Sequence, residues 1–147
     1  MDKLDKIRGK RFDDGLAVRK QVLGDAYVET SLQGVDEFSL PMQKLVTEYC
    51  WGEIWTRPGL ERHERSLINL GMLCALNRPH ELRVHVRGAI NNGLSIEKIQ
   101  ETLLQVAIYC GVPAGLEAFR IAKEVIAEMK AADSIAVAND INGSNAS

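Results

Sequence analysis

The segment "NRPHELRVHVRGAINNG", residues 77–93, gathers side chains that could do acid–base or metal chemistry. Within it, "HELRVH" is similar to the zinc signature H-E-x-x-H, in which two histidines four residues apart share one helix face and bind one ion. His80 and His85 are instead five residues apart, about 140° around a helix, so they face different sides. The remaining histidine, His63, lies far back in the chain. We therefore expect no metal site.

Acid–base chemistry is the second possibility for this segment. Glu81 and His85 are four residues apart, which makes them neighbours on one side of a helix. A carboxylate beside an imidazole fixes the ring tautomer and raises its proton affinity, which suits a group that donates a proton near neutral pH. The alternative is an ordinary surface pair that stabilises the helix by a few tenths of a kcal/mol. Spacing alone favours the ordinary pair.

The elements that would position these residues are helices. Apolar residues recur at helical spacing in six stretches, 6–24, 42–55, 60–77, 79–93, 96–110 and 114–132, and the segment 25–41 is looser. Gly24, Gly93 and Gly111 are stop signals, Pro79 suits a first helical turn, and Ser95 suits an N-cap. We expect an all-α, single-domain bundle of about six helices.

The expected domain covers residues 1–133, and the polar residues 134–147 predict a disordered tail. Several helices carry apolar residues around more of their circumference than one small bundle needs, which predicts self-association.

Composition narrows the function classes. The 147 residues suffice for one domain, and 46% hydrophobic with 26% charged residues is an ordinary soluble balance. A net charge of −2 gives no basic field to attract nucleic acid or anionic lipid. The apolar runs are too short to span a bilayer, and the charged first residues contain no signal segment. We expect a cytoplasmic protein that binds neither nucleic acid nor membranes.

Most of the chain resembles one known family. The stretches "EYCWGEIWTRPGLERHERSLINLGMLCALNRPHELRVHVRGAINNG" and "LLQVAIYCGVPAGLEAFRIAKEV", and more weakly "VRKQVLGDAYV", closely resemble the 4-carboxymuconolactone decarboxylase family. The match runs from Glu48 to about Val125, so it is far more specific than a short motif.

The wider superfamily includes alkylhydroperoxidase D, whose fold the resemblance implies and whose site resembles C-x-x-C-x-x-x-H. With that histidine placed on His85, the two cysteine positions fall on Arg78 and Glu81. The chain has three cysteines but no CxxC pair, and we expect all three to be buried as small hydrophobes. Thiol peroxidase chemistry is therefore disfavoured.

The resemblance implies cofactor-free decarboxylation of 4-carboxymuconolactone to the 4-oxoadipate enol-lactone, in the protocatechuate branch of the β-ketoadipate pathway. It also implies assembly into trimers or hexamers. The substrate would be a dicarboxylate lactone that accepts its own electrons, so neither a metal nor an organic cofactor is required. The alternative is a relative without thiol chemistry or decarboxylase activity, a helical oligomer that binds a small acid.

Roles for individual residues follow from the implied reaction. His85, backed by Glu81, is our candidate acid for the ring carbon. An arginine should hold the carboxylate that stays, because its planar fork matches a carboxylate in two bonds. Arg78 is the first candidate, with Arg57 and Arg65 as alternatives, while Arg83 and Arg87 should face solvent or another subunit. Trp55 and Gln105 could line the pocket, although Trp55, four residues from Trp51, favours core packing.

Overall fold

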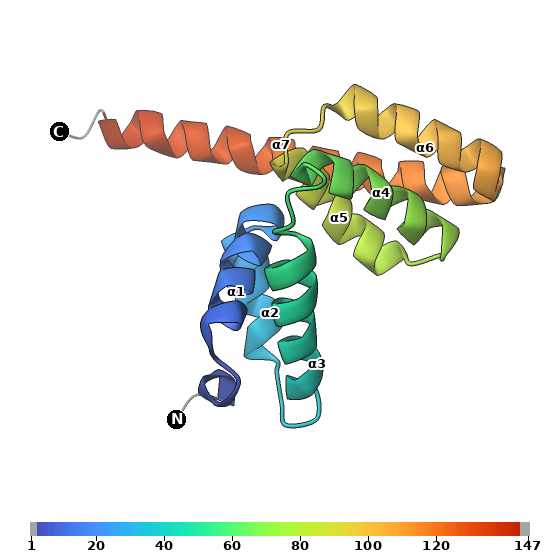
Figure 1. Cartoon of the computed structure of the whole chain (residues 1–147). Helices are drawn as coiled ribbons and strands as arrows, with labels where there is room; N and C mark the ends of the chain where they lie inside the picture. The colour runs from blue at the N-terminus through green and yellow to red at the C-terminus, as the bar shows by residue number, and fades with distance from the viewer. Residues whose placement is uncertain (1–2, 145–147) are drawn as a thin grey trace. The chain divides into compact units, whose positions relative to one another are not determined.

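The protein is helical throughout the part that the structure describes. This computed structural model describes residues 3–144, with side chains for residues 3–137, and it contains no strand within that range (Figure 1). The elements in chain order are η1 (Lys3–Lys6), α1 (Lys10–Leu23), α2 (Asp25–Gln33), α3 (Leu40–Leu45), η2 (Val46–Ile54), α4 (Arg62–Ala75), α5 (Pro79–Asn91), α6 (Ile96–Cys110) and α7 (Val112–Ser144). The predicted all-α class is confirmed.

Most helix ends fall at the residues that the sequence indicated. Gly24, Gly93 and Gly111 have φ angles of 91°, 89° and 101°, a backbone conformation that glycine adopts without a steric penalty. Pro79 opens α5, and Ser95 directly precedes α6. Glycine placement therefore predicted where three of the helices end.

The looser segment 25–41 was not expected to form a helix, and here the prediction was wrong. Residues Asp25–Gln33 form α2, in which Val28 is the fully buried residue. A nine-residue helix with so few buried positions has little amphipathic pattern to detect. It is stabilised mainly by packing against α1.

Packing distinguishes two compact units within this helical domain. The first comprises the described residues up to Ile68 together with Gly88–Ser95, and the second comprises Asn69–Arg87 and the described residues from Ile96 onward. The helices α4 and α5 each contribute to both units.

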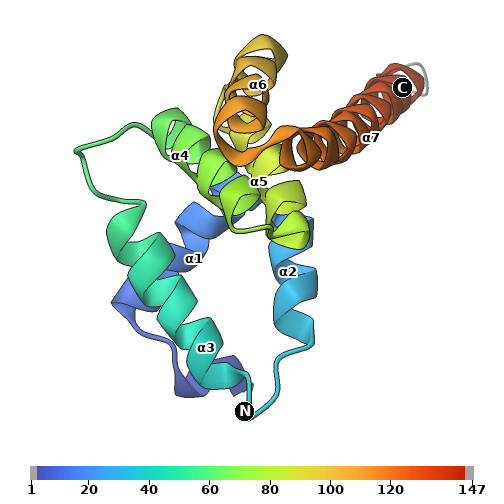
Figure 2. The same cartoon turned by 90° about the vertical axis from the view of Figure 1, so that its right-hand side faces the viewer.

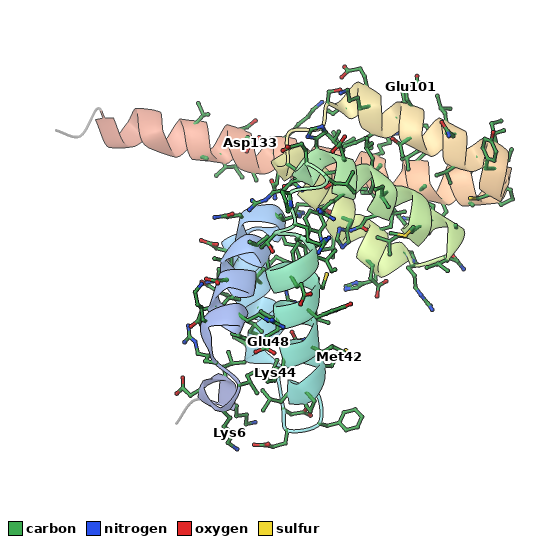
Figure 3. The ribbon with its side chains drawn as sticks, in the orientation of Figure 1. Lys6, Met42, Lys44, Glu48, Glu101 and Asp133 are labelled. Atoms are coloured by element: carbon green, nitrogen blue, oxygen red, sulfur yellow. The ribbon has the colours of Figure 1, made fainter. Side chains whose placement is uncertain are left out.

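In the first unit, α1 packs closely against the continuous helix formed by α3 and the π-helical segment η2 (Figure 2). The approach is backbone to backbone. A Cβ added at Gly15 would lie 2.0 Å from the Thr47 carbonyl oxygen, and one at Gly52 would lie 2.8 Å from the Arg11 carbonyl oxygen. Lys44 and Glu48, labelled in Figure 3, form an ion pair of 2.5 Å along the outside of α3 and η2.

In the second unit, α6 packs along α7 (Figure 1). The packed residues are the apolar stripes that the sequence pattern predicted: Ile99, Leu103, Val106, Ala118, Ile121, Ala122 and Val125 are all buried. Gly115 allows this contact, since a Cβ there would lie 2.5 Å from Cβ of Ala107.

The last helix continues further than expected. α7 extends to Ser144 and so includes residues 134–144 of the segment predicted as a disordered tail, while residues 145–147 lie outside the described part. The reason is composition, because "KAADSIAVAND" contains several alanines and no proline or glycine. Asp133, labelled in Figure 3, lies on the part of α7 that extends past the N-terminal end of α6. Among the described residues, no helix is long and apolar enough to cross a membrane.

Candidate active site

The helix that carries His85 and Glu81 begins at a tight connection. Asn77 closes α4 with a φ of 53°, which asparagine tolerates better than most residues. The Arg78 N–H donates to the Leu73 carbonyl at 2.9 Å, and Pro79 then supplies the first turn of α5. The chain therefore reverses between α4 and α5 without a long loop.

His85 is half-buried and faces Asn69 of α4, which lies in the same unit. Asn69 Nδ2 is 3.4 Å from His85 Nδ1. An amide nitrogen can only donate, so Nδ1 must accept in this arrangement, and the neutral ring then carries its proton on Nε2. Leu82 and Val86, on either side of His85 in the sequence, are buried and anchor this part of α5.

The electrostatics of His85 differ from the prediction. Burial lowers the pKa of the imidazole below its ordinary value of 6.5, and the charge of Glu81 opposes this shift without reversing it. The spacing correctly placed a carboxylate beside the ring, but the penalty for burying a charged imidazole is the larger effect. His85 is therefore mostly neutral at pH 7.

Arg83 and Arg87 of α5 have acidic partners within the chain. Arg83 donates to Glu124 at 3.0 Å and also to Glu128, and Arg87 donates to Glu128 at 3.2 Å. We expected Arg83 and Arg87 to serve solvent or a subunit contact. In the structure these two arginines connect α5 to α7.

Two further predicted site residues lie in the second unit. Arg78 is exposed and borders a cavity of about 20 Å³, which is too small for a lactone. Gln105 is exposed on α6, so water can hydrogen-bond to its amide. None of the predicted site residues lines the two larger cavities, of about 730 and 700 Å³.

Three predicted site residues lie in the first unit. Trp55 is buried, with 5% of its surface exposed, and its ring stacks on Trp51 with centroids 4.9 Å apart, which is the core-packing alternative. Arg57 is exposed, and its carbonyl accepts a hydrogen bond of 3.0 Å from Arg65 Nη2. Arg65 Nε is buried and has no hydrogen-bond partner among the described residues.

Sequence reasoning missed two polar residues. One is Asn69, for which the sequence carries no signal beyond its place on the predicted helix, four residues before the apolar Leu73. The other is Arg19, which is buried and donates to Gln43 at 3.0 Å while its Nε has no partner in the described part. Arg19 follows Phe12 and Gly15 on the apolar face of α1, and that register could have revealed it.

The three cysteines differ in exposure and share no disulfide in the described part. Cys50, Cys74 and Cys110 are free, and burial raises the pKa of Cys50 and takes that of Cys74 to about 11. Raised pKa values disfavour the reactive thiolate. Cys110 is exposed, contrary to the expectation that all three would be buried. Residues 3–137 contain no cluster of three or more His, Cys, Asp or Glu side chains placed to hold a metal ion.

Comparison with known proteins identifies the family. Residues 41–124, more than half of the chain, match the carboxymuconolactone decarboxylase family. The chain belongs to this family. It is 44% identical over 125 residues to the nitrosuccinic acid decarboxylase npaB of Metarhizium robertsii, a match that covers 85% of this chain and 87% of that protein. It is 40% identical over 120 residues to the 4-carboxymuconolactone decarboxylase of Acinetobacter baylyi, covering 82% and 90% respectively.

The family match and these two relatives agree on the type of reaction. Both relatives are decarboxylases, and each match covers more than four fifths of both chains. The chain is accordingly a decarboxylase, a carbon–carbon lyase. The two relatives act on different acids, so the substrate is a separate question.

Proposed function

We propose that the chain decarboxylates 4-carboxymuconolactone to the 4-oxoadipate enol-lactone, in the protocatechuate branch of the β-ketoadipate pathway and in the cytoplasm. The observation that carries this proposal is the 40% identity, over 90% of its length, to a 4-carboxymuconolactone decarboxylase. The family match over residues 41–124 supports it, since it overlaps most of the stretch from Glu48 to about Val125 that resembles this family.

The reaction needs little from the protein beyond anion stabilisation. The bond between the ring carbon and the departing carboxylate breaks, CO₂ leaves, and the electron pair moves through the ring double bond onto the lactone carbonyl oxygen. One proton from solvent then adds to ring carbon and gives the enol-lactone. The substrate itself accepts the electrons, so the proposal requires no metal and no organic cofactor.

A second candidate substrate is nitrosuccinic acid, favoured by the 44% identity to a nitrosuccinic acid decarboxylase. Here the electron pair of the breaking bond would move onto the nitro group. In both acids an electron acceptor can therefore delocalise the electron pair that the departing carboxylate leaves, a proton then adds to carbon, and both products keep a carboxymethyl arm. One site that stabilises the developing anion and binds the retained arm would suit either acid.

His85 and Glu81 are the proposed catalytic residues. A neutral imidazole is a poor proton donor but a good hydrogen-bond donor, so we propose that its N–H binds the oxygen on which charge develops. Losing one such donor typically costs about 2.7–4 kcal/mol of transition-state stabilisation. Glu81 limits how far burial lowers the pKa of the ring.

An arginine is proposed to hold the retained carboxylate, with Arg78, Arg57 and Arg65 as candidates. Trp55 and Gln105 remain proposed pocket residues. The departing carboxylate should not bind an equally strong cationic partner, because such an ion pair would stabilise the substrate more than the transition state.

We also propose that the chain forms homo-oligomers, trimers or hexamers. Supporting this, α6 and α7 expose a set of large apolar side chains: Leu104 is 46% exposed, Ile108 79%, Tyr109 84% and Leu116 67%. Leu104 and Ile108 are four residues apart and share one face of α6, and contiguous exposed apolar surface commonly marks a protein interface. Light scattering on the eluted protein should give a mass of three or six chains, and a monomer at micromolar concentration would contradict the proposal.

The substrate is tested with the purified protein and both acids. The lactone is unstable, so it is generated in place from carboxymuconate, and CO₂ release is followed with and without protein, in parallel with nitrosuccinate. We expect acceleration with the lactone. Acceleration with nitrosuccinate alone would replace the proposed substrate by the second candidate. No acceleration with either acid would favour the helical oligomer that binds a small acid.

A further inference from the structure

We infer that Asn69 is a positioning residue that holds His85 in the tautomer with its proton on Nε2. The geometric part of this inference stands on the structure of the second unit alone. Its catalytic consequence rests on the proposed function, because an Nε2–H group is useful only if an anion develops beside it.

With Nδ2 of Asn69 as the amide atom that faces the ring, the pair has one arrangement of donor and acceptor. Asn69 projects from α4, His85 projects from α5, and Asn69 Nδ2 lies 3.4 Å from His85 Nδ1. Both side chains are half-buried, so neither can turn freely into solvent. Because Nδ2 has only hydrogens to offer, it donates, and Nδ1 must use its lone pair.

This contact also opposes protonation of the ring. An imidazolium carries a hydrogen on both nitrogens, so Nδ1–H would then point at the hydrogens of the Asn69 amide. Burial of His85 acts in the same direction. Both effects favour the neutral ring, and donation from Asn69 Nδ2 favours the tautomer with its proton on Nε2.

Asn69 and Glu81 have different effects on the same ring. Glu81 lies one turn before His85 on α5 and acts through its negative charge, which favours the protonated ring. Asn69 is uncharged and acts through the direction of its N–H. A carboxylate at position 69 would instead accept a hydrogen from Nδ1, which would leave a bare lone pair on Nε2 and stabilise the imidazolium.

The substitution Asn69→Asp therefore reverses the tautomer with almost no change in shape. For the wild-type protein, ¹⁵N NMR of labelled histidine should show the proton of neutral His85 on Nε2, assigned by comparison with His85→Gln. In Asn69→Asp the proton should move to Nδ1 and the pKa of His85 should rise. At a pH above this raised pKa, where the ring is neutral, the turnover number should fall by about 10²–10³-fold, as for loss of an oxyanion donor.

Gln100→Glu is the matched control, because it makes the same amide-to-carboxylate change at an exposed position of α6 in the same unit. It should leave both the tautomer and the turnover number unchanged. A wild-type spectrum with the proton of neutral His85 on Nδ1 would overturn the inference. This outcome depends on the wild-type protein alone, so it holds even where a variant fails to fold. An Asn69→Asp protein that keeps Nε2–H, or keeps wild-type turnover, would also overturn it.

The two proposals can fail separately. Wild-type protein that decarboxylates neither acid would refute the proposed function, while the NMR spectrum would still decide whether Asn69 sets the tautomer.

Discussion

Replacing His85 by three different residues should separate a hydrogen-bond donor from a proton donor. His85→Ala removes the Nε2–H group, and the loss of about 2.7–4 kcal/mol corresponds to about 10²–10³-fold in turnover number. The amide nitrogen of glutamine reaches about as far from Cα as imidazole Nε2, so His85→Gln should lose less than about tenfold. The asparagine nitrogen corresponds in position to Nδ1, so His85→Asn should be as slow as His85→Ala.

The structure indicates that these variants will fold. His85 is half-buried, while the neighbouring Leu82 and Val86 are buried and hold α5 in place. Loss of the contact with Asn69 should cost only about 0.5–1.5 kcal/mol of unfolding free energy. Turnover numbers are measured at saturating acid, with circular dichroism to confirm the helices. Equal losses in the glutamine and alanine variants would refute the donor role, and an alanine variant within twofold of wild type would remove His85 from the reaction.

Three further predictions concern stability and cofactors. As pH falls below about 6.5, urea denaturation should show wild-type protein losing stability relative to His85→Gln, because the unfolded imidazole binds a proton that burial disfavours in the fold; parallel pH curves would contradict this. Gly15→Ala places a Cβ 2.0 Å from the Thr47 carbonyl oxygen and should lower the free energy of unfolding by about 1–3 kcal/mol or more. At Gly71 an added Cβ would have no neighbour within 4 Å outside its own helix, so Gly71→Ala should raise the free energy of unfolding by about 0.5–1 kcal/mol by favouring α4. Equal melting temperatures for these two variants would show that α1 and η2 do not approach as closely as described. Exhaustive chelation should leave the decarboxylation rate unchanged, and a loss reversed by zinc would establish a metal requirement.

The helices could largely be predicted from the sequence because their signals are local. Gly93 and Gly111 end helices through their own backbone freedom, and Pro79 begins one because it lacks an N–H. The helix α2 was missed because its stability comes from neighbours and not from its own pattern. The helix over residues 42–55 was predicted, but the π-helical form of η2 within it was not, since Gly52 lies against the backbone of α1, which is distant in sequence.

The candidate site was predictable to the level of one helix. Spacing placed Glu81 beside His85, and that neighbour relation is local. It could not show that burial outweighs the carboxylate, because burial depends on residues from other helices. Nor could it show that Asn69 donates to His85, since the two are brought together by the turn between α4 and α5. The direction of the pKa shift and the contact with Asn69 therefore depend on the fold.

The central claim is that the acid accepts the electron pair released with CO₂, so that the protein only stabilises an anion. The most direct measurement compares CO₂ release from 4-carboxymuconolactone with release from its ring-saturated analogue. The analogue keeps both carboxylates but lacks the double bond that connects the breaking bond to the carbonyl. The protein should decarboxylate the unsaturated lactone and leave the analogue intact over the same period. Comparable CO₂ release from both compounds would contradict the claim.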